Sequence, residues 1–243
     1  MTFLNVATTS FAKNQVAITL GRGVFGTHLG LAFHSANDGT KVIHLAFHKL
    51  LKTDSFPSDE SCWVCCIVDL PPRASAQLVG MLRGLSKKRP HIGYGINLLA
   101  GHGSFGPTGS YKAPKGSDGF TCSTMITELF RASALPLIDE TSWLPDTVNL
   151  AWGEAVCCLL ETLHPEDQDH IAAVRKNNLG LRVRPEEVAA AAAIDYASRP
   201  ASFLVASANA TAAFNCLNAN CPPITVPDRF AHCVAIYENK TTG

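Results

Sequence analysis

The chain has 243 residues, of which 47% are hydrophobic and 16% charged, and its 20 basic and 20 acidic side chains give a formal net charge of zero. This composition excludes an intrinsically disordered chain and is typical of a folded protein with one substantial core. Without an excess of basic residues there is no surface to hold a phosphate backbone, so the sequence predicts no nucleic-acid partner.

The chain shows no targeting segment. Its opening, MTFLNVATTSFAKNQVAITLGRG, lacks the basic and apolar regions of a secretory signal. No apolar run approaches the roughly 20 residues that span a bilayer, so we expect no transmembrane segment. We expect a cytoplasmic protein, although a specialised secretion system can deliver a protein without a signal into another cell.

The nine cysteines lie mostly in apolar runs such as CWVCCIVDL and EAVCCLLETL. This pattern favours reduced, buried thiols over a disulfide framework. A bridge between Cys216 and Cys221 in an oxidising compartment is the alternative interpretation.

Two alternating runs near the N-terminus predict a β-hairpin. In THLGLAFHS (27–35) and KVIHLAFHKL (41–50), small residues and histidines occupy one face and large apolar residues the other. The Asp-Gly pair in the intervening SANDGT favours a tight turn. A third run, SCWVCCIVDL (61–70), is more continuously apolar and predicts an interior strand.

The rest of the chain predicts mainly helices. A helix over 71–88 precedes an irregular, Gly-rich and Pro-rich segment at 90–121, which we expect to shape a functional site. The sequence further predicts a helix that begins near Cys122, helices over 146–163, 165–177, 185–198 and 201–217, and a final strand in RFAHCVAIYE. These elements indicate an α+β fold, with a core over residues 1–143 and a helical extension over 144–243 that packs on it.

Cys122 has the position that a nucleophile requires. It begins a helix after the turn at Gly119, and a helix N-terminus stabilises a thiolate, so we expect its pKa to be lowered. The free N–H groups there can also hold an oxyanion. A structural cysteine near a helix start is the alternative interpretation.

A base and an orienting group are available in the hairpin. His28 and His44 both lie on the face of small residues and can be neighbours across the two strands. One imidazole can accept the proton of the thiol while the other fixes its tautomer.

These segments carry a family resemblance. HLGLAF and TKVIHLAF resemble the two histidine-bearing strands of papain-like cysteine hydrolases of the NlpC type, and GFTCSTMITELF resembles their cysteine helix. GYGINLLAG (93–101) is similar to the tyrosine-containing segment that often precedes that cysteine. Because the histidines come first, the resemblance is to the circularly permuted branch, which includes lecithin:retinol acyltransferase-like proteins and bacterial hydrolases. It covers residues 27–134.

The resemblance implies a catalytic triad with Cys122 as the nucleophile, His28 as the general base and His44 as the orienting group. It implies a thiol hydrolase that cleaves an amide or peptide bond through an acyl-enzyme, without a cofactor or a metal ion. Hydrolysis of a lipid ester, or acyl transfer by the same triad, stays open. The substrate is therefore a peptide, a peptidoglycan fragment or a lipid.

Three other interpretations compete. A zinc site would use His28, His34, His44 and His48 with Cys62 and Cys65, but the sequence has no second ligand pair at the usual spacing. Ser104 in GHGSFG lacks the strand and helix that flank a serine nucleophile, and fits a loop over the site better. A papain-like scaffold without activity could bind a protein partner through the C-terminal helices.

Overall fold

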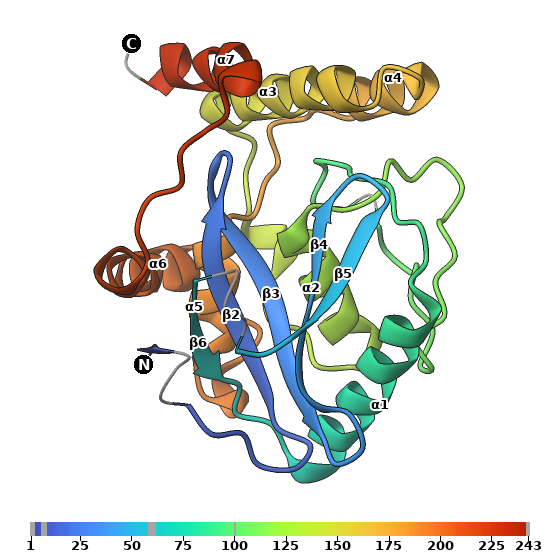
Figure 1. The fold of residues 1–243 in the computed structure, drawn as a ribbon, viewed down its shortest axis with the longest axis vertical. Coiled ribbons are helices and arrows are strands. Elements are labelled where there is room, and N and C mark those ends of the chain that lie inside the picture. The colour runs from blue at the N-terminus through green and yellow to red at the C-terminus, as the bar shows by residue number, and fades with distance from the viewer. Residues whose placement is uncertain (1–2, 6–8, 58–61, 100, 242–243) are drawn as a thin grey trace.

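The computed structural model describes residues 3–5, 9–57, 62–99 and 101–241. Over these residues the chain has an α+β fold, as predicted, with a six-stranded sheet in the order β1-β6-β2-β3-β4-β5 (Figure 1). Neighbouring strands are antiparallel throughout. The strands are β1 (Leu4–Asn5), β2 (Val16–Gly23), β3 (Gly26–Ser35), β4 (Gly39–Phe47), β5 (Leu50–Ser55) and β6 (Trp63–Ile67).

The described helices are α1 (Pro72–Lys88), α2 (Cys122–Ala132), α3 (Thr147–Leu163), α4 (Gln168–Lys176), α5 (Pro185–Ala192), α6 (Phe203–Asn220) and α7 (Ala231–Thr241). Three short 3-10 helices accompany them: η2 (Glu140–Ser142), η3 (Tyr196–Ser198) and η4 (Asp228–Phe230). None of the helices in this part of the chain combines the length and apolar character needed to cross a membrane.

The alternation of β3 places its residues on two faces of the sheet. Leu29, Leu31 and Phe33 lie in the main core, which α1, α2 and α5 cover from one side (Figure 1). Ala32 belongs to a smaller cluster on the opposite face. Because side chains alternate along a strand, His28 lies on the face of Ala32, away from the main core.

The C-terminal half contributes to two separate layers. Val188 and Ala189 of α5 and Ala206 of α6 are buried in the main core with the strands, so this core draws on both sides of residue 143. Helices α3, α4 and α7 instead form a layer beyond one end of the sheet (Figure 1). Their apolar residues form separate clusters, one of them around Trp152. A domain boundary at 143 stays a prediction.

The expected final strand is wrong: its residues form η4 and the helix α7. Phe230 and Cys233 are buried, and their spacing suits one face of a helix that packs against α3. The run 41–50 is also divided, because the chain turns at Lys49, which has a φ of 57°, and returns as β5. Of the expected strand at 61–70, residue 61 lies outside the described residues.

The expectation that the cysteines are all reduced is wrong as well. Two disulfides join Cys62 to Cys221 and Cys158 to Cys233, each with a Cα–Cα distance of 5.5 Å. Cys221 is therefore paired across the fold and not with Cys216, because folding brings its helix end against the start of β6. The remaining cysteines are free: Cys65, Cys66, Cys122, Cys157 and Cys216.

Candidate active site

Helix α2 begins at Cys122 because the residue before it is a strong N-cap. The Thr124 N–H donates to Oγ1 of Thr121 at 3.0 Å, and the Thr121 N–H donates to Oγ1 of Thr124 at 2.8 Å. This reciprocal capping box fixes the first turn of the helix. The N–H groups of Cys122 and Ser123 have no acceptor within the helix, so they can face an oxyanion.

The thiol meets the histidines where β3 and β4 separate. The pairing of these strands runs from Ser35 opposite Gly39 to Leu31 opposite Ile43 and goes no further. Beyond that point the strands diverge, and α2 contacts both of them beside the opening (Figure 1). There the Leu29 backbone lies close enough to the sulfur of Cys122 to affect the pKa of its thiol.

A glycine between the two histidine positions makes room for neighbouring strand residues. A Cβ on Gly30 would lie 2.6 Å from Oγ1 of Thr19 and 2.9 Å from the Val42 side chain, which is closer than real Cβ contacts come. Any larger residue at position 30 would therefore push the Thr19 or Val42 side chain aside, whereas the Cβ of His44, at 3.5 Å, would be in ordinary contact.

The two histidines form one hydrogen-bonded chain that ends on a carboxylate. Nε2 of His28 lies 2.8 Å from Nδ1 of His44, and Nε2 of His44 lies 3.3 Å from Oδ2 of Asp54. A carboxylate only accepts, so Nε2 of His44 carries the proton and its Nδ1 is an acceptor. Nε2 of His28 must then be the donor, which leaves Nδ1 of His28 as an unprotonated base.

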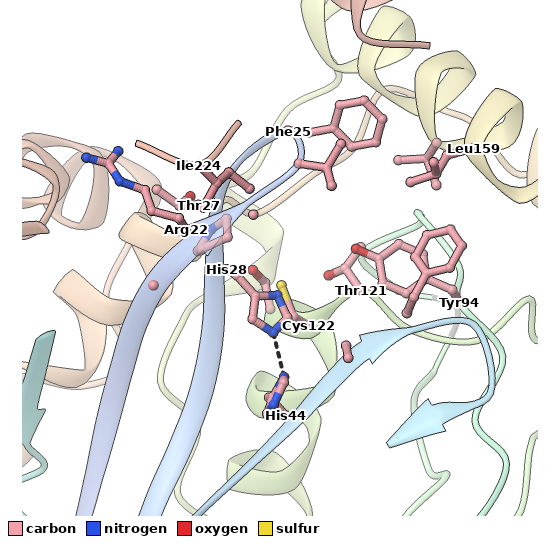
Figure 2. A pocket seen from close by; sticks show the side chains of 18 of the residues that line it. Arg22, Phe25, Thr27, His28, His44, Tyr94, Thr121, Cys122, Leu159 and Ile224 are labelled. Carbon is pink, nitrogen blue, oxygen red and sulfur yellow. Dashed lines mark hydrogen bonds between the residues drawn. The ribbon is translucent and has the colours of Figure 1, made fainter. Parts of the chain in front are cut away.

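That base faces the cysteine. Figure 2 shows the sulfur of Cys122 beside the His28 ring, away from the ring edge that bonds His44. Cys122, His28 and His44 all line one cavity. The structure therefore brings together the three residues that the sequence singles out, and it adds Asp54.

Burial dominates the protonation of this group. It raises the pKa of the Cys122 thiol, while the nearby backbones of Leu29 and Ser123 and the charge of Arg182 act in the opposite direction. The lowered pKa that the helix start predicts is therefore wrong for this state, because Cys122 is only 5% exposed. Burial, and after it the neighbouring His44, lowers the pKa of His28 to about 3. The resting pair is a neutral thiol and a neutral imidazole.

The cavity has a volume of about 560 Å³, which suits a small-molecule ligand or one end of a larger substrate. Its base is formed by Cys122, the histidines and Trp63. Trp152, Val156 and Leu159 of α3 and the segment 222–224 form much of the remaining wall. The lining is largely apolar, and it joins the sheet to the helical layer.

Known proteins offer no guide here. No family model, no curated protein and no solved structure matches the chain. The interpretation of the site rests on its own residues and geometry.

The irregular segment 90–121 contributes less to the cavity than expected. Of the described residues in this segment, only Tyr94 and Thr121 line the cavity. Ser104 is buried elsewhere, and the neighbouring Gly103 N–H donates to Glu128 of α2 at 2.8 Å. This part of the segment therefore packs beside α2, away from the cavity lining.

A second histidine group lies at the end of β4. Nδ1 of His48 accepts from the Tyr94 N–H at 3.1 Å, and its Nε2 donates to Asp167 at 2.9 Å. The His170 ring, on α4, lies 4.3 Å from the His48 ring between centroids. These contacts hold the layer of α3, α4 and α7 against the end of the sheet.

Two of the residues that the zinc interpretation requires as ligands make other contacts in the folded protein. Cys62 is held in a disulfide, and Nδ1 of His34 bonds Oγ1 of Thr40 at 2.9 Å, away from the cavity. Two other groups of three possible ligands come together in the described part of the chain. One contains the bridged Cys158 and Cys233, and the other is the polar turn His164, Glu166 and Asp167.

Proposed function

We propose that the protein is a thiol-dependent acyl hydrolase with a permuted papain-like arrangement, in which Cys122 attacks a carbonyl carbon. The observation that carries the proposal is the chain from Asp54 through His44 to His28, since it leaves one basic nitrogen directed at the only cysteine in the cavity without a disulfide. A structural cysteine would need no such chain.

The reaction follows from the neutral resting pair. Nδ1 of His28 takes the proton of the Cys122 thiol as the sulfur bonds the carbonyl carbon. The N–H groups at the start of α2 stabilise the oxyanion, and the leaving group departs with the proton from His28. Water, deprotonated by His28, then cleaves the thioester and frees the thiol. His44 orients His28 through both steps, as the third member of the triad.

The bond that is cleaved is an amide or peptide bond in our first proposal. The cavity supports a second candidate, an ester of an apolar acyl group, because Phe25, Trp152 and Leu159 offer an apolar surface beside the thiol. Transfer of the acyl group to an acceptor other than water uses the same first step.

A matched pair of substrates separates these candidates. We would measure release of p-nitrophenol from p-nitrophenyl octanoate and of p-nitroaniline from octanoyl p-nitroanilide, which carry the same acyl group. Intact-mass analysis would follow the octanoyl thioester. The control is Cys157→Ala, which removes another buried free cysteine.

We expect turnover and an octanoyl adduct in the wild type and in the Cys157→Ala variant, and neither in Cys122→Ala. Faster cleavage of the anilide than of its uncatalysed reference favours an amidase, and cleavage of the ester alone favours an esterase. An unchanged rate in Cys122→Ala would remove the proposal and favour a non-catalytic scaffold.

Two further expectations stay predictions. A protein partner could use α6, on which Leu204, Val205 and Phe214 are exposed. For the site of action, the two disulfides favour an oxidising compartment over the cytoplasm. This is compatible with delivery of the protein out of the cell that makes it.

A further inference from the structure

Two arginines line the cavity, and neither makes an ion pair with a carboxylate of the described residues. Arg22 donates hydrogen bonds to Oδ1 of Asn218 and to the Cys221 carbonyl. The guanidinium carbon of Arg182 instead lies 3.7 Å from the centroid of the Trp152 ring, so this group is stacked on an aromatic face. A partly buried guanidinium is normally paired, so the arrangement of Arg182 needs an explanation.

The nearest acidic residue along the chain is occupied elsewhere. Oε2 of Glu186 accepts a hydrogen bond from Oγ1 of Thr27 at 2.6 Å, and Glu186 makes no ion pair with Arg182. The Glu186 charge reaches the guanidinium only at longer range. Burial lowers the pKa of Arg182 more than any neighbour raises it, so its environment disfavours the unpaired charge.

Stacking on Trp152 leaves the edge of the guanidinium available. A stacked guanidinium keeps its N–H groups in the plane of the fork, the geometry that binds a carboxylate or phosphate with two parallel hydrogen bonds. Arg182 and Cys122 line the same cavity, and the charge of Arg182 acts on the thiol. An anion bound at Arg182 would therefore belong to the molecule whose carbonyl lies at Cys122.

The surroundings define the rest of that molecule. Val156, Leu159 and Ile224 line the cavity beside the Arg182 and Trp152 pair. These side chains offer no hydrogen bonds and suit an apolar chain. We propose that Arg182 on Trp152 is an anion subsite, which selects substrates that join an apolar part to one carboxylate or phosphate group. Its role in selection rests on the proposed hydrolase function, whereas anion binding itself does not.

Three ligands of equal chain length test the subsite without catalysis when they are added to the Cys122→Ala chain, which lacks the proposed nucleophile and cannot cleave the amide. We would titrate this full chain with sodium octanoate, octyl phosphate and neutral octanamide, and follow binding by calorimetry. Both anions, or one of them, should bind about ten-fold or more tightly than octanamide, as charge-assisted hydrogen bonds allow. The anion that binds more tightly identifies the head group. Equal affinity for all three ligands would overturn the subsite.

Variants on one loop localise the effect. Arg182→Gln should remove the preference for anions and leave octanamide binding unchanged. Arg184→Gln removes the same charge two positions away, outside the cavity lining, and should keep the preference. Arg182→Lys keeps the charge without the planar fork and should retain an intermediate preference. An anion preference that survives Arg182→Gln would also overturn the subsite.

The cysteine variant separates the two proposals. Cys122→Ala should bind octanoate as the wild type does, because Arg182 and Trp152 remain in place. Loss of turnover together with equal binding of all three ligands would leave the hydrolase and remove the subsite. Anion binding in a protein that never forms an acyl adduct would leave the subsite and remove the hydrolase.

Discussion

Two histidines, one in strand β4 and one directly after it, differ in their hydrogen bonds. His44, in β4, belongs to a hydrogen-bonded chain that is open at its far end, where Nδ1 of His28 faces the Cys122 thiol (Figure 2). Both nitrogens of His48, which follows β4, are occupied, one by the Tyr94 N–H and the other by Asp167. Under the proposed function, the same residue type four positions apart thus serves chemistry in one place and attachment of the helical layer in the other.

This difference shows that the role of a histidine depends on whether one or both of its ring nitrogens are hydrogen-bonded. An imidazole with both nitrogens satisfied is a structural bridge, whereas one that donates at one nitrogen and is free at the other is a base. Variants of the two groups should therefore separate activity from stability.

The largest expected effect comes from a variant of the hydrogen-bonded chain that runs from Asp54 through His44 to His28. His28→Ala should lower kcat by about 10²–10⁴-fold, because the neutral thiol of Cys122 loses the base that takes its proton. Hydrolysis of p-nitrophenyl octanoate at a fixed pH measures this loss. The midpoint of urea unfolding should change much less. A variant with full kcat would show that another group is the base.

The group around His48, in which both ring nitrogens are hydrogen-bonded, should show the reverse: a large effect on stability and a small effect on kcat. His48→Ala should lower the free energy of unfolding by about 2–4 kcal/mol, because the buried Tyr94 N–H loses its acceptor and Asp167 loses a donor. Urea denaturation at pH 7 measures it, and kcat of the folded fraction should stay within about three-fold of the wild type. His164→Ala removes only ring contacts with the group and is the milder control.

The difference in the free energy of unfolding between the wild type and His48→Ala should become smaller as the pH falls. Burial lowers the pKa of His48 to about 4, against an unfolded value near 6.5, and the neighbouring His170, Lys49 and His164 side chains act in the same direction, whereas Asp167 opposes the shift. Between these values the unfolded state binds the extra proton, so stability falls as the pH falls. The gap between the wild type and His48→Ala should shrink by about 1–2 kcal/mol from pH 7 to pH 5. A gap that widens would reverse the sign of the shift.

The smallest effect on kcat should come from Asp54, at the exposed end of the same hydrogen-bonded chain. The Asp54 side chain is 48% exposed, so water can replace part of its role as an acceptor. We expect Asp54→Ala to lower kcat about 3- to 10-fold at constant KM, because the tautomer of His44 is less well fixed. Lys52→Ala, across the strand pair from His44, is the matched control and should not lower kcat.

Short-range pattern made the positions of Cys122 and of the two histidines predictable. Alternation in the hairpin placed His28 and His44 on one face, and the start of α2 follows from local capping. Asp54 was missed because its strand, β5, has no clear alternation. The register of β4 with β5 brings Asp54 to His44, and this register depends on the turn at Lys49.

The wall of the cavity could not be predicted. Trp152 and Arg182 lie far along the chain from Cys122, and only packing of the helical layer brings them to one cavity. The error at α7 has the same origin. A short run with Phe230 and Cys233 fits a strand or a helix, and contact with α3 decides between them.

The buried, protonated state of Cys122 has a chemical consequence. Cys62, one half of a disulfide, lines the same cavity as this free thiol. Sulfur exchange requires an attacking thiolate, so a strongly acidic thiol at position 122 would threaten to rearrange the cross-link beside it. Because burial raises the pKa of the thiol, the proposed mechanism ionises this sulfur only when His28 takes its proton, and oxidised and reduced sulfur can coexist in one cavity.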